Sequence, residues 1–266
     1  RTRVRRLQSP NVLATLEGAA PDGRSGAVIV TAHYDHYGLG AKVAGDSIYN
    51  GAVDNASGVA TLLAVAHGLA RAPARPRRSV LFLATTAHEA GMHGAATYAA
   101  APPIPLARTA AVIDVEQANL WGATRDVVLL GASLSTLGDA LTAAATAAGL
   151  SIGQDPDGSA GRFFRSSPFP LAQAGVPAVS VRSGVEYVDQ PPDWGTDQHQ
   201  RYYAERYHQP ADQVRAEFDY TGALQQARFL GRLAWNLAQD STYASWLPGS
   251  EFRAAGQRLR GQRQNR

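Results

Sequence analysis

Near-continuous apolar runs that alternate with helix-like segments constrain the fold of this chain more than any other feature. Strand-length apolar runs recur at residues 11–18, 26–35, 79–87, 109–116, 126–132 and 176–183. Apolar residues at helical spacing lie between or after several of them, at residues 56–72, 134–149 and 221–239. Such alternation is typical of a largely parallel sheet covered on both faces. The sequence therefore predicts an α/β fold with a central mixed, mostly parallel sheet and helices on both faces.

The length and composition indicate one large domain. The chain has 266 residues, 45% of them hydrophobic and 18% charged, which permits a full core. We expect a single domain over residues 11–240, a basic N-terminal segment at residues 1–10 and a basic C-terminal tail at residues 241–266. Residues 183–213 show no period and predict a long structured loop, which in a compact domain is usually functional. No apolar run approaches the length of a bilayer span, so we expect no membrane partner.

Two absences narrow the possible functions. The chain has no cysteine, which excludes disulfides, thiolate zinc sites and cysteine nucleophiles. The net charge of +3 raises the question of nucleic-acid binding, but the arginines cluster at the two ends of the chain without an aromatic-interleaved motif. We therefore expect no nucleic-acid partner.

Side chains that bind metals follow several of the predicted strands. A single histidine or aspartate there is more often a capping residue, but this fold brings the carboxyl ends of its strands together. Two histidines with three carboxylates are the ligands expected for zinc or a similar divalent ion, and a shared carboxylate can hold two ions roughly 3.5–4 Å apart. The candidates are His33 and Asp35, Asp54, His88 and Glu89, Asp114 and Glu116, and His208.

Two of these candidates leave alternatives open. Asp114 and Glu116 share one face of their strand, so either can reach one metal. Asp35 lies two residues after His33, where its carboxylate could fix the tautomer of that imidazole. His36 and His93 have no partner visible in the sequence.

Six motifs in order resemble those of the bacterial di-zinc aminopeptidases of the aminopeptidase S and aminopeptidase Y types. They are "TAHYDHYG", "YNGAVDNASGVATLL", "RSVLFLATTAHEAGMHGA", "NLWG", "AQAGVPAVSV" and "RYHQPADQ". The resemblance implies a secreted or periplasmic enzyme with a phosphorylase/hydrolase-like zinc-exopeptidase domain that removes N-terminal amino acids from peptide substrates. It also implies ligands for two zinc ions, with one ion possible, and a tyrosine, Tyr207, that supports the oxyanion. His33 would bind one zinc, Asp54 would bridge both, Glu89 and His208 would complete the second, and Glu116 would be the other acidic ligand.

The sequence departs from the pattern of that family in three places. His88 stands where members carry the glutamate that acts as general base, and Glu116 replaces an aspartate ligand. Ser167 and Pro168 replace an Asp-His pair, so we expect polar contacts near the site to be lost. His88 could serve as the base or bind a metal directly. The chain is then an aminopeptidase, an impaired or repurposed member that binds peptides, or a glutaminyl-cyclase-like enzyme with one zinc.

Overall fold

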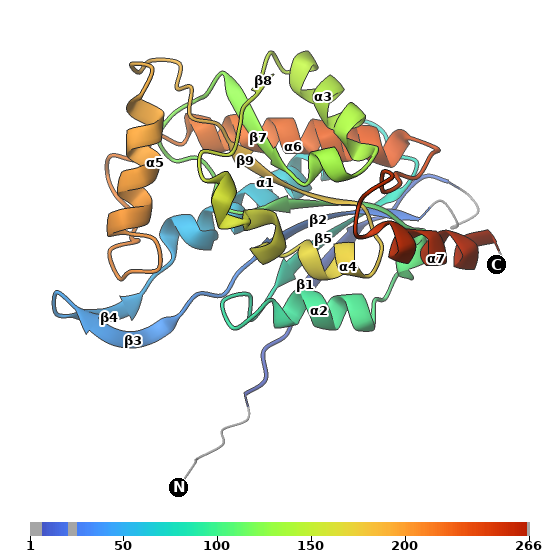
Figure 1. Cartoon of the computed structure of the whole chain (residues 1–266), viewed down its shortest axis with the longest axis horizontal. Coiled ribbons are helices and arrows are strands. Elements are labelled where there is room, and N and C mark those ends of the chain that lie inside the picture. Colours follow the sequence, from blue (N-terminus) through green and yellow to red (C-terminus); the bar gives the residue numbers. More distant parts are fainter. Residues whose placement is uncertain (1–6, 21–25, 265–266) are drawn as a thin grey trace, which may run out of the picture.

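A mixed sheet of seven strands forms the centre of the molecule (Figure 1). The structure is a computed structural model that describes residues 7–20 and 26–264. The strand order is β1-β5-β2-β6-β9-β7-β8, in which β5, β2, β6 and β9 run parallel, while β1 and β7 pair antiparallel with β5 and β9. The predicted α/β class and mixed sheet are confirmed. The strands are β1 (Val12–Leu16), β2 (Ala27–His33), β5 (Ser79–Thr85), β6 (Thr109–Val115), β7 (Asp126–Leu130), β8 (Ser151–Ile152) and β9 (Ala178–Ser183).

Successive residues of the central strands point into two separate cores, one on each face of the sheet. In β2, for example, Val28 and Val30 belong to one core and Ile29 to the other. The first core is covered by α1 (Gly58–Ala70), α3 (Leu137–Ala147) and α6 (Thr221–Gln239). The second core is covered by α2 (His93–Ala100), α4 (Phe169–Gln173) and the segment that leads into α7 (Arg253–Gln264). Burial on both faces explains why these strands are apolar without alternation.

As far as residue 264, the C-terminal segment is packed against the domain, unlike the separate tail expected at residues 241–266, of which residues 265 and 266 lie outside the described residues. Trp246 and Phe252 are 3% and 4% exposed and belong to the second core. The Trp246 indole Nε1 also donates a hydrogen bond to the backbone oxygen of Gly175 at 3.0 Å. Two aromatic anchors therefore hold a segment whose arginines dominate its sequence. Of the predicted N-terminal segment, residues 1–6 lie outside the described residues.

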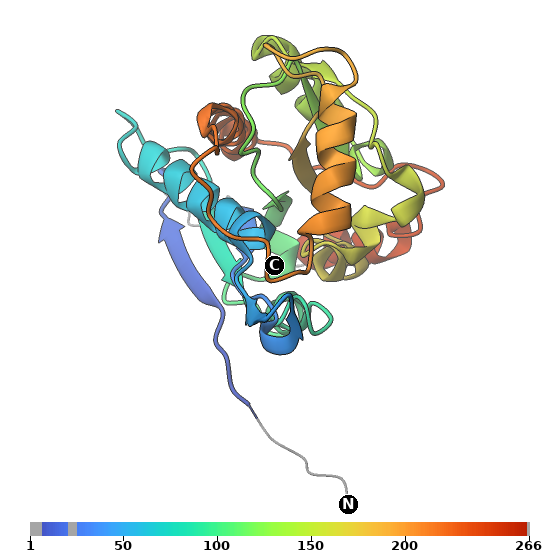
Figure 2. The ribbon, with the colours of Figure 1, turned by 90° about the vertical axis from the view of Figure 1, so that its left-hand side faces the viewer.

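The predicted loop at residues 183–213 contains a helix, α5 (Trp194–Glu205), and this part of the prediction is wrong. A hairpin of β3 (Gly38–Val43) and β4 (Asp46–Tyr49) was also not predicted. Both elements lie at one end of the molecule, on the left in Figure 1 and facing the viewer in Figure 2. Within the described residues, no helix combines the length and apolar character needed to cross a membrane.

Candidate metal centre

The candidate ligands come from three neighbouring strands and two further segments. His33 is the last residue of β2, His88 and Glu89 follow β5, and Glu116 directly follows β6. These strands are adjacent in the order β5-β2-β6, so their carboxyl ends meet at one edge of the sheet. Asp54 lies in the turn η1 (Ala52–Ser57), which leads into α1, and His208 follows α5.

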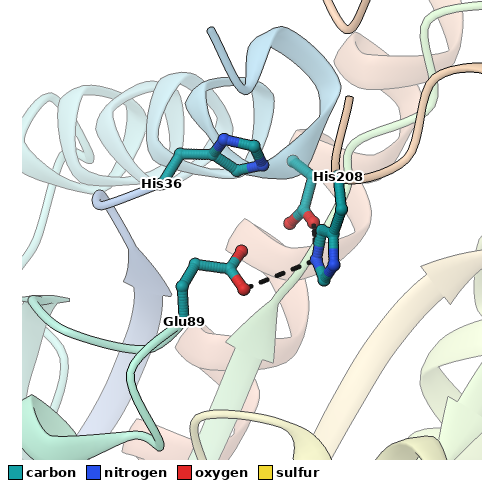
Figure 3. Close-up of side chains that lie close together, drawn as sticks. His36, Glu89 and His208 are labelled. Atoms are coloured by element: carbon teal, nitrogen blue, oxygen red, sulfur yellow. Dashed lines mark ion pairs between the residues drawn. The ribbon is translucent and has the colours of Figure 1, made fainter. Parts of the chain in front are cut away.

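Asp54 lies between the two histidines that the sequence singled out. Its Oδ1 is 3.2 Å from Nε2 of His33, and its Oδ2 is 3.3 Å from Nε2 of His208. His208 Nε2 is also 3.4 Å from Oε2 of Glu89 (Figure 3). Each oxygen of one buried carboxylate therefore faces a different histidine, which is the arrangement that a carboxylate shared by two cations requires.

The side chains form two groups in which one ligand atom per residue lies within 4.8 Å of the others. The first group contains His36, Asp54, Glu89 and His208, and the second contains His33, His88 and Glu116. The structure thus brings the five predicted metal ligands into these two groups, together with His88, a predicted base or ligand, and with His36. No partner of His36 was visible in the sequence, where it lies three residues after His33 in the loop before β3.

The ligand atoms have the unmet bonding capacity expected of a cation site. Buried polar atoms in proteins nearly always have a hydrogen-bond partner. Here the buried atoms without one include Nε2 of His33, His36 and His208, and carboxylate oxygens of Asp54, Glu89 and Glu116. Imidazole nitrogens and carboxylate oxygens in tetrahedral number suit zinc. The donor set therefore fits two divalent ions.

The pKa shifts of the candidate ligands also indicate a cation site. Burial alone would lower the pKa of His33, but the adjacent Asp54 carboxylate raises it to about 9. Asp54 and Glu89 likewise raise the pKa of His208 to about 9, against the effect of burial. Burial would raise the pKa of Asp54, yet its contacts with His208 and His33 hold that pKa well below its usual range. Protons on His33 and His208 therefore occupy positions at which a bound dication would replace them.

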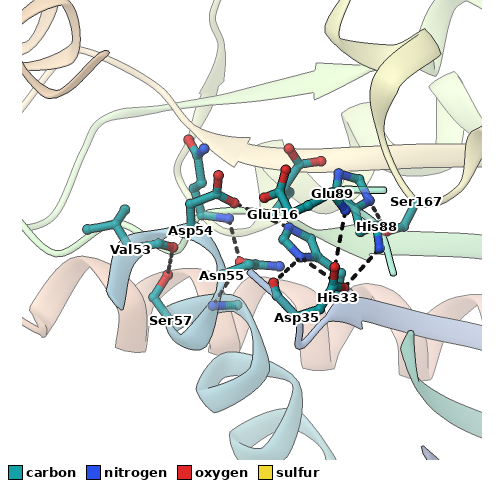
Figure 4. A network of polar contacts seen from close by, with 12 residues as sticks. His33, Asp35, Val53, Asp54, Asn55, Ser57, His88, Glu89, Glu116 and Ser167 are labelled. Atoms are coloured by element: carbon teal, nitrogen blue, oxygen red, sulfur yellow. Dashed lines mark hydrogen bonds and ion pairs between the residues drawn. The ribbon is translucent and has the colours of Figure 1, made fainter. Parts of the chain in front are cut away.

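Hydrogen bonds from two directions fix the turn that carries Asp54 (Figure 4). The Asp212 carboxylate accepts hydrogen bonds from the backbone N–H of Val53 and of Asp54, each at 3.0 Å. The Asn55 amide donates to the backbone oxygen of Val115 at 3.0 Å, and its Oδ1 accepts from the N–H of Gln117 at 2.9 Å. The Asn55 contacts tie the turn to the end of β6, and the Asp212 contacts tie it to the segment that follows α5.

Asp35 contributes through its backbone as well as through its side chain. The Nδ1 of His33 lies 3.1 Å from the backbone oxygen of Asp35, whereas the nearest carboxylate oxygen is 3.9 Å away. The carbonyl, rather than the predicted carboxylate, therefore fixes the tautomer that turns Nε2 toward Asp54. The carboxylate instead accepts hydrogen bonds from the backbone N–H of His88 at 2.9 Å and of Glu89 at 3.1 Å. It holds the turn that presents those two side chains.

His88 is packed between a histidine and a serine. Its ring stacks on that of His33, with centroids 4.0 Å apart, and its Nδ1 lies 3.0 Å from Oγ of Ser167. Burial and the neighbouring His33 lower the pKa of His88, which favours the neutral imidazole. The expectation that polar contacts are lost at this position is wrong for Ser167, because its hydroxyl contacts the residue that replaces the glutamate.

Two tyrosines contact His208. The Tyr37 hydroxyl lies 3.1 Å from Nδ1 of His208, and the Tyr207 ring stacks on the imidazole with centroids 3.7 Å apart. Burial and nearby carboxylates, Asp54 foremost, raise the pKa of Tyr207 above its usual range, so its hydroxyl keeps its proton. The sequence pointed to Tyr207 but not to Tyr37.

The two acidic residues at the end of β6, Asp114 within the strand and Glu116 directly after it, have separate roles. The Asp114 carboxylate is buried and accepts a hydrogen bond from the Ser180 hydroxyl at 2.9 Å. Burial and the neighbouring Glu116 raise the pKa of Asp114 to about 8. Glu116 belongs to the ligand group and forms an ion pair with Arg182 at 2.8 Å. The geometry thus favours Glu116 over Asp114 as the ligand.

A pocket of about 260 Å³ opens beside the ligand groups. Its walls include Glu89, Glu116 and His208 from those groups, together with Tyr37 and Tyr207. His88, Arg162, Arg165 and Arg182 also line it. A small molecule in this pocket would touch the candidate ligands directly.

Comparison with known protein families agrees with this geometry. The sequence model of peptidase family M28 matches residues 11–232. The chain belongs to peptidase family M28. No curated protein matches this M28 chain.

Solved structures show the same fold at low sequence identity. A peptidase M28 precursor from Shewanella amazonensis SB2B is 22% identical with a TM-score of 0.63, over 90% of this chain and 46% of that one. The zinc aminopeptidase BSAP from Bacillus subtilis is 20% identical with a TM-score of 0.61, over 85% of this chain and 49% of BSAP. A glutaminyl cyclase from Porphyromonas gingivalis is 16% identical with a TM-score of 0.59, over 84% and 76%. The M28 chain described here thus spans about half the length of the first two.

Proposed function

We propose that this M28 protein is a metal-dependent exopeptidase that removes N-terminal residues from peptides at a two-zinc site. His33 and Glu116 would hold one ion, Glu89 and His208 the other, and Asp54 would bridge them. The observation that carries this proposal is the position of Asp54, whose two oxygens lie 3.2 Å and 3.3 Å from different histidines. The zinc aminopeptidase BSAP, which shares this fold, supports the choice of metal and reaction.

The chemistry follows from the groups around the pocket. Bound zinc would polarise the scissile carbonyl and lower the pKa of water to about 7. The Tyr207 hydroxyl, which keeps its proton, can donate a hydrogen bond to the oxygen that becomes negative during attack. His88 offers a neutral imidazole beside His33 and Glu116, which suits it to accept a proton from water and pass it to the leaving amine.

His88 also supports a second candidate function. His88 belongs to a ligand group with His33 and Glu116, so it could be a further ligand instead of the base. The protein would then be an impaired or repurposed member that binds peptides. A glutaminyl-cyclase-like reaction with one zinc is a third reading, supported only by the shared fold of the Porphyromonas gingivalis enzyme.

Metal analysis and an activity assay on the same preparation test the proposal. Protein stripped with a chelator and restored with zinc should bind two ions per chain and hydrolyse aminoacyl anilides. Fewer than one ion per chain would overturn the two-metal site. Conversion of N-terminal glutamine to a cyclic product, with one ion and no hydrolysis, would favour the cyclase.

The variant His88→Glu separates the first two readings. If His88 is the base, its replacement lowers turnover, by at most the about 10²–10⁴-fold that a positioned proton acceptor contributes. If His88 is a ligand that blocks the water position, glutamate restores the missing base and turnover rises. Zinc content, measured in parallel, separates a loss of the base from a loss of the metal.

A further inference from the structure

A second, smaller cavity lies beside the metal pocket and shares part of its wall. It has a volume of about 50 Å³, and its lining includes Gln117, Arg162, Arg182 and His199. Arg162 and Arg182 also line the pocket that contains the candidate metal ligands. One water molecule needs about 10–15 Å³ measured in this way, so the cavity admits a larger polar group.

Nitrogen atoms without a hydrogen-bond partner surround this cavity. Gln117 Nε2, Arg162 Nε, Arg182 Nε and His199 Nε2 are all buried and make no hydrogen bond. The carboxylate of Asp155, which also lines the cavity, lies 4.0 Å from Arg162 Nε, beyond hydrogen-bond distance. Amide and guanidinium N–H groups only donate, so the group that satisfies them must be an acceptor.

The charges around the cavity favour an anionic acceptor over a neutral one. Arg182 is 9% exposed, and its carboxylate partner Glu116 would share its charge with a metal ion. Arg162 stacks on the Tyr203 ring at 4.1 Å and pairs with Asp157, whose side chain is 44% exposed. Asp155, 4.0 Å from Arg162, is the carboxylate in the cavity lining. Two guanidinium groups and one carboxylate therefore line the cavity, which leaves a net positive charge in its wall.

The same charges explain the state of His199. Burial, with the positive charges of Arg162 and Arg182, lowers the pKa of His199 to about 4. The imidazole is therefore neutral near pH 7 and adds a hydrogen-bonding group rather than a third positive charge.

The position of Arg182 places the cavity next to the proposed reaction centre. Its Nη2 donates to Glu116 Oε1 at 2.8 Å, while its Nε is one of the unsatisfied donors. The cavity and the proposed metal ligand are thus separated by one guanidinium group. The carboxylates in the lining of the metal pocket are Glu89 and Glu116, both proposed ligands, so the lining described here offers arginines rather than a free carboxylate to a substrate.

We propose that this cavity is a subsite for a substrate carboxylate, with Arg162, Arg182, Gln117 and His199 as its hydrogen-bonding groups. The proposal rests on the exopeptidase function proposed above and names its substrate class, namely peptides with a carboxylate close to the scissile bond. That carboxylate belongs either to the C-terminus of a dipeptide or to the side chain of an acidic residue. Both present the same planar acceptor to the guanidinium groups.

A binding measurement tests the subsite without relying on catalysis. N-acetylglycine and N-acetylglycinamide differ in the carboxylate alone, and calorimetric titration compares their affinities for zinc-loaded and zinc-free protein. We expect the acid to bind about 10-fold or more tightly than the amide in both forms, as charge-assisted hydrogen bonds imply. Equal affinities for the acid and the amide in the zinc-free protein would overturn the proposal, because the cavity would then hold water only.

Three variants test which residues are responsible. Arg162→Gln should bring the two affinities within about twofold, as the loss of one charged donor implies. Gln117→Glu keeps an acceptor for Arg182 and Tyr203 but places a negative charge at the cavity. It should therefore also bring the affinities for the acid and the amide within about twofold. Arg165→Gln is the matched control, because Arg165 lines the metal pocket but not the cavity. Loss of the preference in Arg165→Gln as well would show general charge attraction and overturn the subsite. Thermal unfolding of each variant checks that it is folded.

Hydrolysis assays identify the source of the carboxylate and separate this proposal from the proposed function. Faster hydrolysis of Ala-Gly than of Ala-Gly amide, lost in Arg162→Gln, assigns the subsite to a C-terminal carboxylate. Faster hydrolysis of a glutamyl than of a glutaminyl anilide, also lost in that variant, assigns it to an acidic side chain. Hydrolysis without preference in either pair overturns the subsite and leaves the exopeptidase standing. If the acid is preferred in the binding measurement but none of these compounds is hydrolysed, the subsite stands and the exopeptidase function is overturned.

Discussion

The two halves of the candidate metal centre are built in different ways. His33, His88 and Glu116 lie at the ends of three adjacent strands, and the His33 side chain is fully buried. His36 and His208 come from loops beside the hairpin and after α5, and the His208 side chain is 25% exposed. Hydrogen bonds of a central sheet position the first half, whereas loops position two ligands of the second, His36 and His208, and its Glu89 follows β5 beside His88.

This difference implies unequal affinities for the two ions. Ligands held by a rigid sheet lose little conformational freedom when a metal binds, while ligands on loops must be ordered. The strand-end half also gains a histidine, His88, in place of the glutamate expected from the family pattern. We therefore expect the strand-end half to bind zinc more tightly, and the loop half to bind the ion that exchanges.

Asp54 belongs to both halves, so its replacement should have the largest effect. Asp54→Asn keeps the shape of the side chain but removes the charge that both ions would share. Because the loss of metal removes several kcal/mol of charge stabilisation, we expect activity to fall by about 10³-fold or more, and the zinc content to fall below one ion per chain. Elemental analysis and the anilide assay measure both.

Asp46→Asn is the control for Asp54→Asn, since Asp46 lies in the hairpin outside both ligand groups. It should keep two ions and full activity. Two ions retained in Asp54→Asn would contradict a shared ligand and would make the two halves independent sites.

Removing one histidine from each half comes next in expected size. His33→Ala and His208→Ala should each lose one ion, but in the metal-free protein they should differ in stability. His33 is fully buried, so its loss leaves a cavity and removes the partner of Asp54 Oδ1, and we expect the free energy of unfolding to fall by about 2–4 kcal/mol. His208 is partly exposed, and its loss should cost about 1 kcal/mol or less.

Denaturant unfolding in the presence of a chelator measures this difference. Equal losses of stability in the two variants would show that the loops hold their half of the centre as firmly as the sheet holds the other.

The contrast between the sheet and the loops also explains which parts of the fold could be predicted from the sequence. The central strands were predictable because apolar residues on both faces form unbroken runs, as at residues 79–87. Helix α5 was missed because its sequence is largely polar and its buried residues are Gly195, Gln198 and Tyr202 rather than an apolar stripe. The C-terminal segment was misread because Trp246 and Phe252 are single anchors among polar and charged residues.

The candidate site was predictable to a similar extent and for a related reason. The five proposed ligands stand out in the sequence because they follow strands or belong to family motifs. The residues that support them do not, since their contacts join distant segments. Tyr37 and His208 are 171 positions apart, and Asp212 and Val53 are 159 apart. The cavity proposed to bind a substrate carboxylate could not be predicted from the sequence either. The four side chains that offer nitrogen atoms to it are spread over residues 117 to 199, and each forms an ordinary contact elsewhere.

The smallest expected effect concerns the hydrogen bonds that hold one histidine in each half. When Nε2 of His208 faces an ion, its Nδ1 carries the ring proton and donates to the Tyr37 hydroxyl, which lies 3.1 Å away. Tyr37→Phe should therefore weaken the loop-half ion by about 10–100-fold, the usual cost of such a partner, and leave the other unchanged. Zinc titration against a competing chelator resolves the two affinities.

Two further variants serve as comparisons for Tyr37→Phe. Ser167→Ala removes the hydroxyl 3.0 Å from His88 Nδ1, so it should affect the strand-end half only, and by less than tenfold, because the stacked His33 still holds the His88 ring. Tyr49→Phe removes a hydroxyl that donates to Ala41 within the hairpin, and should leave both ions unaffected. If Tyr37→Phe weakened both ions equally, the bridging Asp54 would couple the halves so closely that the site would load as one unit. The contrast between sheet and loops would then govern stability but not metal affinity.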